Sequence, residues 1–589
     1  MKDFLKFTLA TIVGIVLSNI VMFIISIIIF VGVLSGTETE TVVKKNTVMM
    51  LDLNGTLSER SQENPWDKLL GDDNTTYGLD DILASIKKAK EHEDIKGIYI
   101  QASSLGASFA SLQEIRAALV DFKESGKFIY AYSDTYTQGL YYLSSVADKI
   151  MLNPKGVVEW KGIAARPVFF KGLLGKIGVD MQVFKVGAYK SAVEPFINTE
   201  MSAENRQQVT EFATSIWNNL VDEVSQSRSL STERLNELAD QMLAYSPAEK
   251  SVEAGLIDTL IYHNDVRNYI KSQIGIDKDN SLDLLSVKDM ANIKKNVPKD
   301  KSGNVIAVYY AYGDIVTTAS SMSDSESIAS EKVIKDLRKL QKDEDVKAVV
   351  FRVNSGGGSA FASEQIWYAV EELKKEKPVV VSMGDYAASG GYYISCGANW
   401  IVAEPTTLTG SIGIFGLVPN VKGLTDKLGL SFDVVKTNKF SDLGATGRPM
   451  NNDEKALLQA YVNEGYDLFI TRCAEGRNTT KEAIDKIGQG RVWTGSKALE
   501  LGLVDELGGI DRALEVAVEK AAIDGYTVLS YPEKENFLSS LLSNKPTNYI
   551  EAKLLKNNLG SYYKEFNLLK NLQSADRLQA RIPFDLSIE

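Results

Sequence analysis

The stretch Gly384-Asp-Tyr-Ala-Ala-Ser-Gly-Gly-Tyr-Tyr393 follows a short β-branched run, residues 378–383, that is typical of a buried strand. Small and aromatic residues come next and can begin a helix, so we expect Ser389 at a strand-to-helix corner. Gly390 and Gly391 would let the backbone approach a ligand closely there. Such a corner suits a nucleophile beside an oxyanion site, although a helix-capping serine is the simpler interpretation of the motif taken alone.

Composition narrows the classes of protein to consider. The chain has 589 residues, 44% of them hydrophobic, which is enough for more than one folded domain. A formal net charge of −12, without any basic stretch, argues against nucleic-acid binding. Cys396 and Cys473 are the only cysteines, which excludes a disulfide framework and a cysteine-based zinc site, while the sequence leaves open whether the two pair.

Histidine is scarce in the chain. His92 and His263 are the only two, and both lie in polar surroundings that resemble helix ends or loops. A histidine base for Ser389 is therefore not expected. The count also excludes a histidine-rich metal centre, so we predict no metal and no other cofactor.

Residues 7–34 contain no charged side chain and are dominated by Ile, Val, Leu and Phe. As a helix they would measure roughly 42 Å at 1.5 Å per residue, enough to span a bilayer with tilt. This apolar stretch is longer than that of a signal peptide and lacks a good cleavage site, so we predict an uncleaved anchor. Lys2 and Lys6 precede it, and Glu38 and Glu40 follow it, which predicts residues 1–6 in the cytoplasm and the rest exported.

The remaining chain repeats itself with an offset of 251 residues (345 − 94). Asp94-Ile-Lys-Gly-Ile-Tyr-Ile100 matches Asp345-Val-Lys-Ala-Val-Val-Phe351, and Gly139-Leu-Tyr-Tyr142 matches Gly390-Gly-Tyr-Tyr393. Strand-like and amphipathic runs alternate in each copy, which indicates an α/β fold with a largely buried sheet. We predict two repeats, residues 45–295 and 303–536, and a C-terminal extension, residues 537–589, to which no chemistry is assigned.

The two copies differ where chemistry is expected. Ser389 corresponds to Gln138, and the glycine-rich loop at residues 354–359 has lost most of its glycines in the first copy. That loop could present N–H groups to an anion, but no Gly-Lys-Ser/Thr follows it as in a phosphate loop. Conversely, Lys190 in the first copy corresponds to Ser441 in the second. Each copy holds what the other lacks, so we predict one site that both copies share.

A lysine can accept a proton at neutral pH only when its pKa falls well below its free value of about 10.4. Burial against apolar neighbours lowers the pKa because it destabilises the ammonium. The Gly, Ala, Tyr and Val residues around Lys190 could form such a pocket, whereas Glu194 would oppose the shift if it pointed inward. A solvated surface lysine is the alternative.

The hydroxyl of Ser411 lies in the predicted turn Thr409-Gly-Ser-Ile-Gly413 and could orient the amine of Lys190. The alternative is that Ser411 only stabilises the turn.

Three segments, residues 185–195, 386–394 and 409–416, resemble the signal peptide peptidase A (protease IV) family in its long, duplicated form. The likeness extends to the anchor and to the order of the copies. It implies tandem ClpP/crotonase-like α/β domains behind one transmembrane helix. It also implies a homo-oligomer, a tetramer, in the bacterial inner membrane with its catalytic domains in the periplasm. The implied substrates are apolar, extended signal peptides left in the membrane after their release from secreted proteins.

The resemblance also implies roles for individual residues. By position, Ser389 is the nucleophile of a Ser–Lys dyad, Lys190 is its general base, and Ser411 orients the lysine. The implied oxyanion site consists of the N–H groups of Gly390 and Gly358. One departure concerns residue 356, where related proteins usually have proline and this chain has glycine, so the loop lacks that rigid residue.

Two other functions fit the same fold. An acyl-CoA enzyme of the crotonase type would use backbone N–H groups as an oxyanion site without needing a serine nucleophile. A non-catalytic membrane scaffold would keep the fold alone. Labelling of Ser389 by a serine-directed probe separates the first from a peptidase, and a peptide-cleavage assay separates the second.

Overall fold

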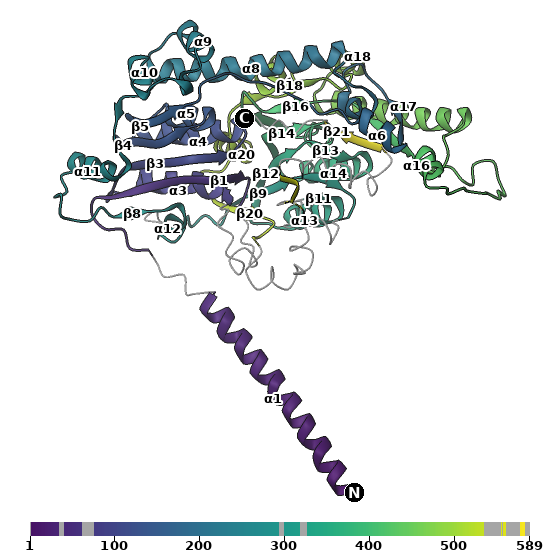
Figure 1. Cartoon of the computed structure of the whole chain (residues 1–589), viewed down its shortest axis with the longest axis horizontal. Helices are drawn as coiled ribbons and strands as arrows, with labels where there is room; N and C mark the ends of the chain where they lie inside the picture. The colour runs from purple at the N-terminus through teal and green to yellow at the C-terminus, as the bar shows by residue number, and fades with distance from the viewer. Residues whose placement is uncertain are drawn as a thin grey trace.

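The computed structural model describes residues 2–34, 41–61, 76–293, 300–318, 327–534, 555, 558–560, 563 and 578–582. Its first element, α1 (Lys2–Leu34), projects away from the folded body (Figure 1). The segment Lys6–Ser26 has a mean hydropathy of 2.4 and is not buried in the protein, so it is long and apolar enough to cross a membrane. The predicted apolar helix is thereby confirmed. Its orientation remains a prediction, and Glu38 and Glu40 lie outside the described residues.

The N-terminal repeat is built on a parallel sheet. Its strands run in the order β2-β1-β3-β4-β5-β7, and β8 pairs with β1 on the side of that path. Parallel neighbours need crossover connections, and helices supply them here. The strands are β1 (Thr47–Ser58), β2 (Thr76–Gly78), β3 (Ile95–Gly106), β4 (Phe128–Tyr136), β5 (Lys149–Val158), β7 (Thr259–Leu260) and β8 (Leu284–Leu285).

The C-terminal repeat has a second sheet with the path β18-β16-β14-β12-β9-β20; off this path, β15 pairs with β14, and β19 pairs with β15. Val379, Val380 and Val381 of β14 are all fully buried, which explains why this run lacks the alternation of a half-exposed strand. The strands are β9 (Val305–Tyr312), β12 (Val346–Ser355), β14 (Val379–Ala388), β15 (Trp400–Ala403), β16 (Leu408–Gly410), β18 (Val492–Thr494), β19 (Glu506–Leu507) and β20 (Thr527–Tyr531).

The duplication is visible in the element boundaries. Helix α3 (Leu79–Glu91) corresponds to α13 (Ser330–Lys342), and α4 (Phe109–Lys123) corresponds to α14 (Ala360–Lys374). Both pairs begin 251 residues apart (330 − 79 and 360 − 109). The two repeats lie side by side, one coloured from purple to teal and the other from teal to yellow-green (Figure 1). The predicted α/β fold with a tandem duplication is confirmed.

Other helices cover the sheets and connect the strands. In the N-terminal repeat they are α5 (Gln138–Ser144), α6 (Lys171–Ile177), η1 (Ser191–Val193), α7 (Glu194–Ile197), α8 (Ala203–Arg228), α9 (Thr232–Asp240), η2 (Leu243–Tyr245), α10 (Ala248–Glu253), α11 (His263–Gln273) and α12 (Val287–Ala291). In the C-terminal repeat they are α15 (Gly390–Tyr393), α16 (Lys422–Lys427), α17 (Asn452–Gly476), α18 (Lys481–Ile487), α19 (Gly495–Glu500) and α20 (Ile510–Ala521).

A third sheet joins the two repeats. Its order is β11-β10-β13-β21-β17-β6, and it contains β6 (Asp180–Lys185), β10 (Asp314–Val316), β11 (Ser327–Ala329), β13 (Gly357–Ser359), β17 (Phe415–Asn420) and β21 (Leu578–Arg581). Strand β6 of the first repeat is antiparallel to β17 of the second over its whole length. The core of the N-terminal repeat also continues into Ala388, Leu408 and Val492 of the other repeat. Both contacts bring the lysine half of the chain against the serine half.

Candidate active site

Ser389 stands at the corner between β14 and α15, as its sequence context predicts. Its backbone has φ 55° and ψ −113°, a conformation that L-residues rarely adopt and that occurs most often at functional sites. Within the described residues its hydroxyl makes no capping bond to α15, so the helix-cap interpretation is wrong. Instead Ser389 Oγ accepts a hydrogen bond from Lys190 Nζ at 2.7 Å and lies 3.3 Å from the carbonyl oxygen of Gly413.

Lys190 lies between β6 and η1 and is only 1% exposed, so the surface-lysine interpretation is also wrong. Besides Ser389, its amine donates to the hydroxyl and to the carbonyl oxygen of Ser411, each at 3.1 Å. Burial lowers the pKa of this ammonium well below its usual value of 10.5. A buried, neutral amine that touches a hydroxyl is suited to accept the proton of that hydroxyl.

Glu194 does not oppose this shift. It is buried, but it accepts hydrogen bonds from Ser202 Oγ at 2.5 Å and from Asn205 Nδ2 at 2.8 Å, both at the start of α8. The carboxylate is therefore occupied at the helix N-terminus. Desolvation is the cause of the lowered pKa of Lys190.

Gln208 of α8 fixes the loop that carries the lysine. Its Nε2 donates to the carbonyl oxygen of Tyr189 at 3.1 Å and to Ser191 Oγ at 2.8 Å. Its Oε1 accepts from the backbone N–H of Val492, at 3.2 Å, in β18 of the other repeat. One buried amide thus ties both neighbours of Lys190 to the half of the chain that carries the serine. This residue could not be identified from the sequence, because a glutamine on a long helix carries no signal of such a role.

Ser411 is held in a strained turn between β16 and β17, with φ 48°. Its N–H donates to the carbonyl oxygen of Arg491 at 2.7 Å, and its hydroxyl lies 3.3 Å from the carbonyl oxygen of Gly490. A methyl group built on Gly490 would lie 2.6 Å from the backbone of Lys190, so this glycine permits the close approach of the two segments.

The glycine-rich loop also reaches the corner. Residues Gly357 to Ser359 form the short strand β13. Gly357 has φ 102°, and a methyl group on it would lie 2.8 Å from the backbone nitrogen of Gly390. The loop therefore touches the residue that follows Ser389, and side chains larger than hydrogen would separate them.

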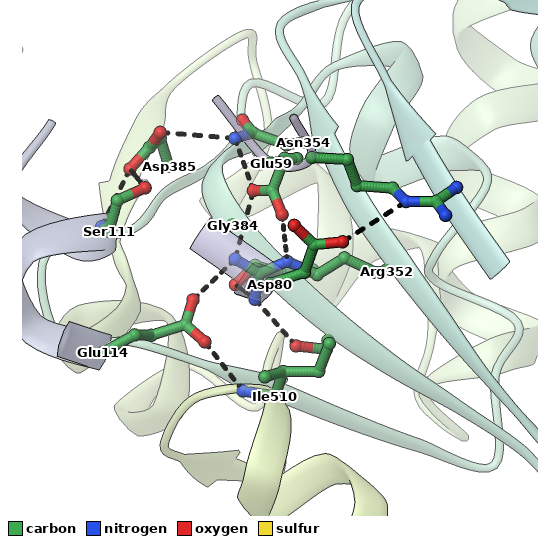
Figure 2. A network of polar contacts seen from close by, with 12 residues as sticks. Glu59, Asp80, Ser111, Glu114, Arg352, Asn354, Gly384, Asp385 and Ile510 are labelled. Atoms are coloured by element: carbon green, nitrogen blue, oxygen red, sulfur yellow. Dashed lines mark hydrogen bonds and ion pairs between the residues drawn. The ribbon is translucent and has the colours of Figure 1, made fainter. Parts of the chain in front are cut away.

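A buried ionic network connects the two repeats (Figure 2). Arg352 of β12 is 1% exposed, and its guanidinium donates to Glu59 at 2.9 Å and to Glu114 at 2.5 Å, both in the N-terminal repeat. Burial raises the pKa of the Glu114 carboxyl, while the guanidinium opposes that rise. The ion pairs of Arg352 with Glu59 and Glu114 therefore hold the two repeats together.

The same network reaches the strand that carries Ser389. Asp385 of β14 accepts hydrogen bonds from the backbone N–H and hydroxyl of Ser111, at 3.0 and 2.8 Å, at the start of α4 (Figure 2). Asn354 donates to Asp385 at 3.2 Å and to Glu59 at 2.7 Å. Burial raises the pKa of Asp385 as well. Contacts from the N-terminal repeat therefore hold β14 four residues before the serine.

The described part of the chain contains no group of His, Cys, Asp and Glu side chains arranged to hold a metal ion. Cys396 and Cys473 are both buried and both free. Burial raises the pKa of the Cys473 thiol, so the reactive thiolate is disfavoured. The hydroxyl of Ser389 and the amine of Lys190 are the reactive groups that meet at the corner.

A strained serine with a buried lysine amine beside it is an arrangement that a serine peptidase can use. The profile of peptidase family S49 matches residues 121–277 and 371–524, one segment in each repeat. The chain belongs to peptidase family S49, a family of serine proteases, in its duplicated form.

Individual relatives agree with this assignment. "Protease 4" of Haemophilus influenzae is 34% identical over 543 residues, which cover 88% of this chain and 88% of that protein. "Putative signal peptide peptidase SppA" of Enterococcus faecium is 34% identical over 231 residues, which cover 39% of this chain and 67% of that protein. Among solved structures, a ClpP1 mutant from Listeria monocytogenes aligns with a TM-score of 0.24 and 16% identity, covering 35% of this chain and 94% of its own. The resemblance to protease IV is confirmed.

Proposed function

We propose that the protein is a membrane-anchored serine endopeptidase in which Ser389 is the nucleophile and Lys190 is the general base. The observation that carries this proposal is the 2.7 Å contact between the Lys190 amine and the Ser389 hydroxyl. As the hydroxyl oxygen attacks a peptide carbonyl, its proton passes to the neutral lysine. The hydroxyl and the carbonyl oxygen of Ser411 each lie 3.1 Å from the amine, and they keep the amine directed at Ser389.

Lys190 next delivers its proton to the departing amine, which completes acylation. In the second half of the reaction the neutral lysine takes a proton from the attacking water and returns it to Ser389 Oγ as the acyl-enzyme is hydrolysed. The N–H groups of Gly390 and Gly358 are proposed to stabilise the oxyanion in both steps. A single donor of this kind typically contributes about 3 kcal/mol to the transition state.

The proposed substrates are signal peptides that remain in the membrane after their release from secreted proteins. The apolar helix α1 supports this choice, because an anchor holds the site beside apolar peptides in the same bilayer. The name of the Enterococcus faecium relative supports it as well. We place α1 in the bacterial inner membrane with its N-terminus in the cytoplasm and the repeats in the periplasm.

A direct test uses the full-length protein in detergent with a synthetic signal peptide. The wild type should cleave the peptide, and Ser389→Ala should not. A fluorophosphonate probe should label the wild type at Ser389. Cleavage of the peptide by Ser389→Ala, or hydrolysis of an acyl-CoA without labelling of Ser389, would contradict the proposal.

We also propose that the chain forms a homo-oligomer, a tetramer by its resemblance to protease IV. In the duplication, residues 431–436 of the second copy correspond to β6 of the first (180 + 251 = 431). Unlike β6, these residues form no strand within the described chain. They leave Phe432 67% exposed and Val435 97% exposed. A neighbouring subunit could cover them by repeating the β6–β17 pairing between chains in a head-to-tail manner.

A further inference from the structure

The two strands that flank the active site are separated by a slot one strand wide. Strand β13 belongs to the glycine-rich loop, and β17 follows the turn that carries Ser411. In the sheet order, β21 stands between them and is antiparallel to both. Without β21, β13 and β17 would each present N–H and C=O groups to the slot. Extended peptides bind to other proteins by adding a strand to edges of this kind.

The occupant of the slot is the chain's own C-terminal segment, residues 578–582. It belongs to the extension to which the sequence analysis assigned no chemistry. The backbone N–H of Ile582 donates to the carbonyl oxygen of Gly356 at 2.9 Å. Hydrogen-bonded pairs alternate along an antiparallel ladder, so the next such pair is Gly358 with Ala580, in agreement with the strand register.

This register brings the Ala580 carbonyl to the catalytic corner. A methyl group built on Gly357 would collide with the Ala580 carbonyl oxygen, and one built on Gly390 would lie 3.1 Å from the same oxygen. The oxygen therefore lies between the glycine-rich loop and the residue after Ser389. That is where the carbonyl of a scissile bond must lie if Gly358 and Gly390 supply the oxyanion N–H groups.

The side chains of the segment alternate as in a bound strand. Leu578, Ala580 and Ile582 are buried, and the two residues between them are half-buried. Leu578 belongs to the apolar cluster of the C-terminal repeat, and a methyl group built on Gly465 would lie within 4 Å of both Leu578 and Ile414 of that cluster. Ala580 is fully buried among glycines. The slot thus accepts a small side chain at the catalytic corner and an aliphatic side chain two residues earlier.

An ion pair fixes the other end of the segment. Arg581 Nη2 lies 2.7 Å from Asp314 of β10. The segment pairs with a strand on each side, buries the aliphatic side chains of Leu578 and Ile582, and forms this ion pair. These contacts together hold it in the slot in a single register.

We propose that residues 578–582 are a built-in pseudosubstrate that competes with peptide substrates for this slot. This inference rests on the proposed function of Ser389 and Lys190. It also specifies the substrate class, namely extended peptides with a small residue before the scissile bond and an aliphatic residue two positions earlier. Occupancy inhibits whether or not the Ala580–Arg581 bond is hydrolysed, because Leu578 and Gln579 keep their pairing with β17.

The first test is a variant of the full chain that ends at Arg577. If residues 578–582 occupy the slot for about 90% of the time, the apparent KM rises about tenfold, because only molecules with an open slot bind substrate. Truncation should therefore lower KM about tenfold for a fluorogenic peptide with leucine and alanine at the two positions, and kcat should stay within about twofold. A synthetic peptide of residues 578–589 should inhibit the truncated enzyme competitively.

A point variant guards against misfolding of the truncated chain. Ala580→Leu places bulk against the glycines at the corner and should lower KM as truncation does. The matched control is Ala291→Leu on the exposed end of α12, which should leave KM unchanged. An unchanged KM in both tail variants, with Ser389 still labelled by a fluorophosphonate, would overturn the pseudosubstrate. Loss of both labelling and cleavage in every variant, including the wild type, would instead overturn the proposed function.

Discussion

The amine of Lys190 meets the hydroxyl of Ser389 at 2.7 Å, although the two residues are 199 positions apart and belong to different repeats. Neither repeat contains both groups, because Gln138 replaces the serine in the first and Ser441 replaces the lysine in the second. The contact exists only when β6 pairs with β17 and the shared core forms. The chemistry of the chain therefore depends on packing between its two halves.

Removal of either reactive group should abolish turnover. We expect Ser389→Ala and Lys190→Ala each to reduce kcat/KM at least about 10³-fold, because the members of such a unit act together. Circular dichroism should show unchanged secondary structure. Lys171→Ala, at an exposed position on α6, is the matched lysine control and should retain wild-type activity. Near-normal cleavage by Lys190→Ala would exclude the lysine as the base.

Activity should follow the ionisation of Lys190. The protonated lysine cannot accept a proton, so kcat/KM should rise with pH through the pKa of this amine, which burial lowers well below 10.5. The rise should therefore be complete well before the ordinary lysine range, and a pH profile of kcat/KM measures it. A profile that rises only near the free lysine value of about 10.4 would contradict the argument from burial.

The same shift has a consequence for stability. Between the lowered pKa of the folded protein and the unfolded value of about 10.4, the native state binds fewer protons than the unfolded state, so stability rises with pH in that window. Lys190→Met removes this titration. Urea unfolding at several pH values should show that the difference in unfolding free energy between wild type and Lys190→Met changes in the wild type's favour as pH increases.

The buried arginine between the repeats should contribute strongly to stability. Arg352→Met leaves Glu59 and Glu114 buried without their cation, and we expect the unfolding free energy to fall by about 3–5 kcal/mol. The control is Arg234→Met, which breaks an exposed pair with Glu237 and should cost about 0–1 kcal/mol. Equal effects of the two substitutions on chemical unfolding would show that the network does not clamp the repeats.

Local signals made the serine corner predictable. The β-branched run at residues 378–383 is followed at once by small residues and two glycines, so the end of the strand and the start of the helix are both encoded within a few positions. The repeat offset made the two halves of the site predictable, because it compares like positions without any knowledge of their contacts. Lys190 was identified in this way.

Contacts between distant segments were not predictable in the same manner. Arg352 follows the apolar run at residues 348–351, and such a charge inside a buried strand indicates a buried partner but does not identify Glu59 or Glu114. Strand β21 left none, because alternation over four residues also occurs by chance in loops. Its place depends on the slot between β13 and β17, which forms only from tertiary structure.

The exposed segment at residues 431–436 should mediate assembly. We expect Phe432→Asp to shift the detergent-solubilised protein to smaller species in analytical ultracentrifugation, because a charge would be buried at the proposed contact. Tyr245→Asp, which changes an aromatic residue that is 89% exposed elsewhere, is the control and should not alter the mass. An unchanged mass for Phe432→Asp would place the subunit interface on another surface.

Because Lys190 and Ser389 lie in different repeats, the active site can form only after both repeats have been synthesised. Ribosomes build the chain from its amino terminus, so the lysine half is complete long before the serine half emerges. A polypeptide interrupted between residues 190 and 389 contains an amine without its hydroxyl partner and cannot cut the proteins around it. Under the proposed function, fragments that end before residue 389 are therefore inactive, and cleavage begins only after the second repeat has been made and has packed against the first.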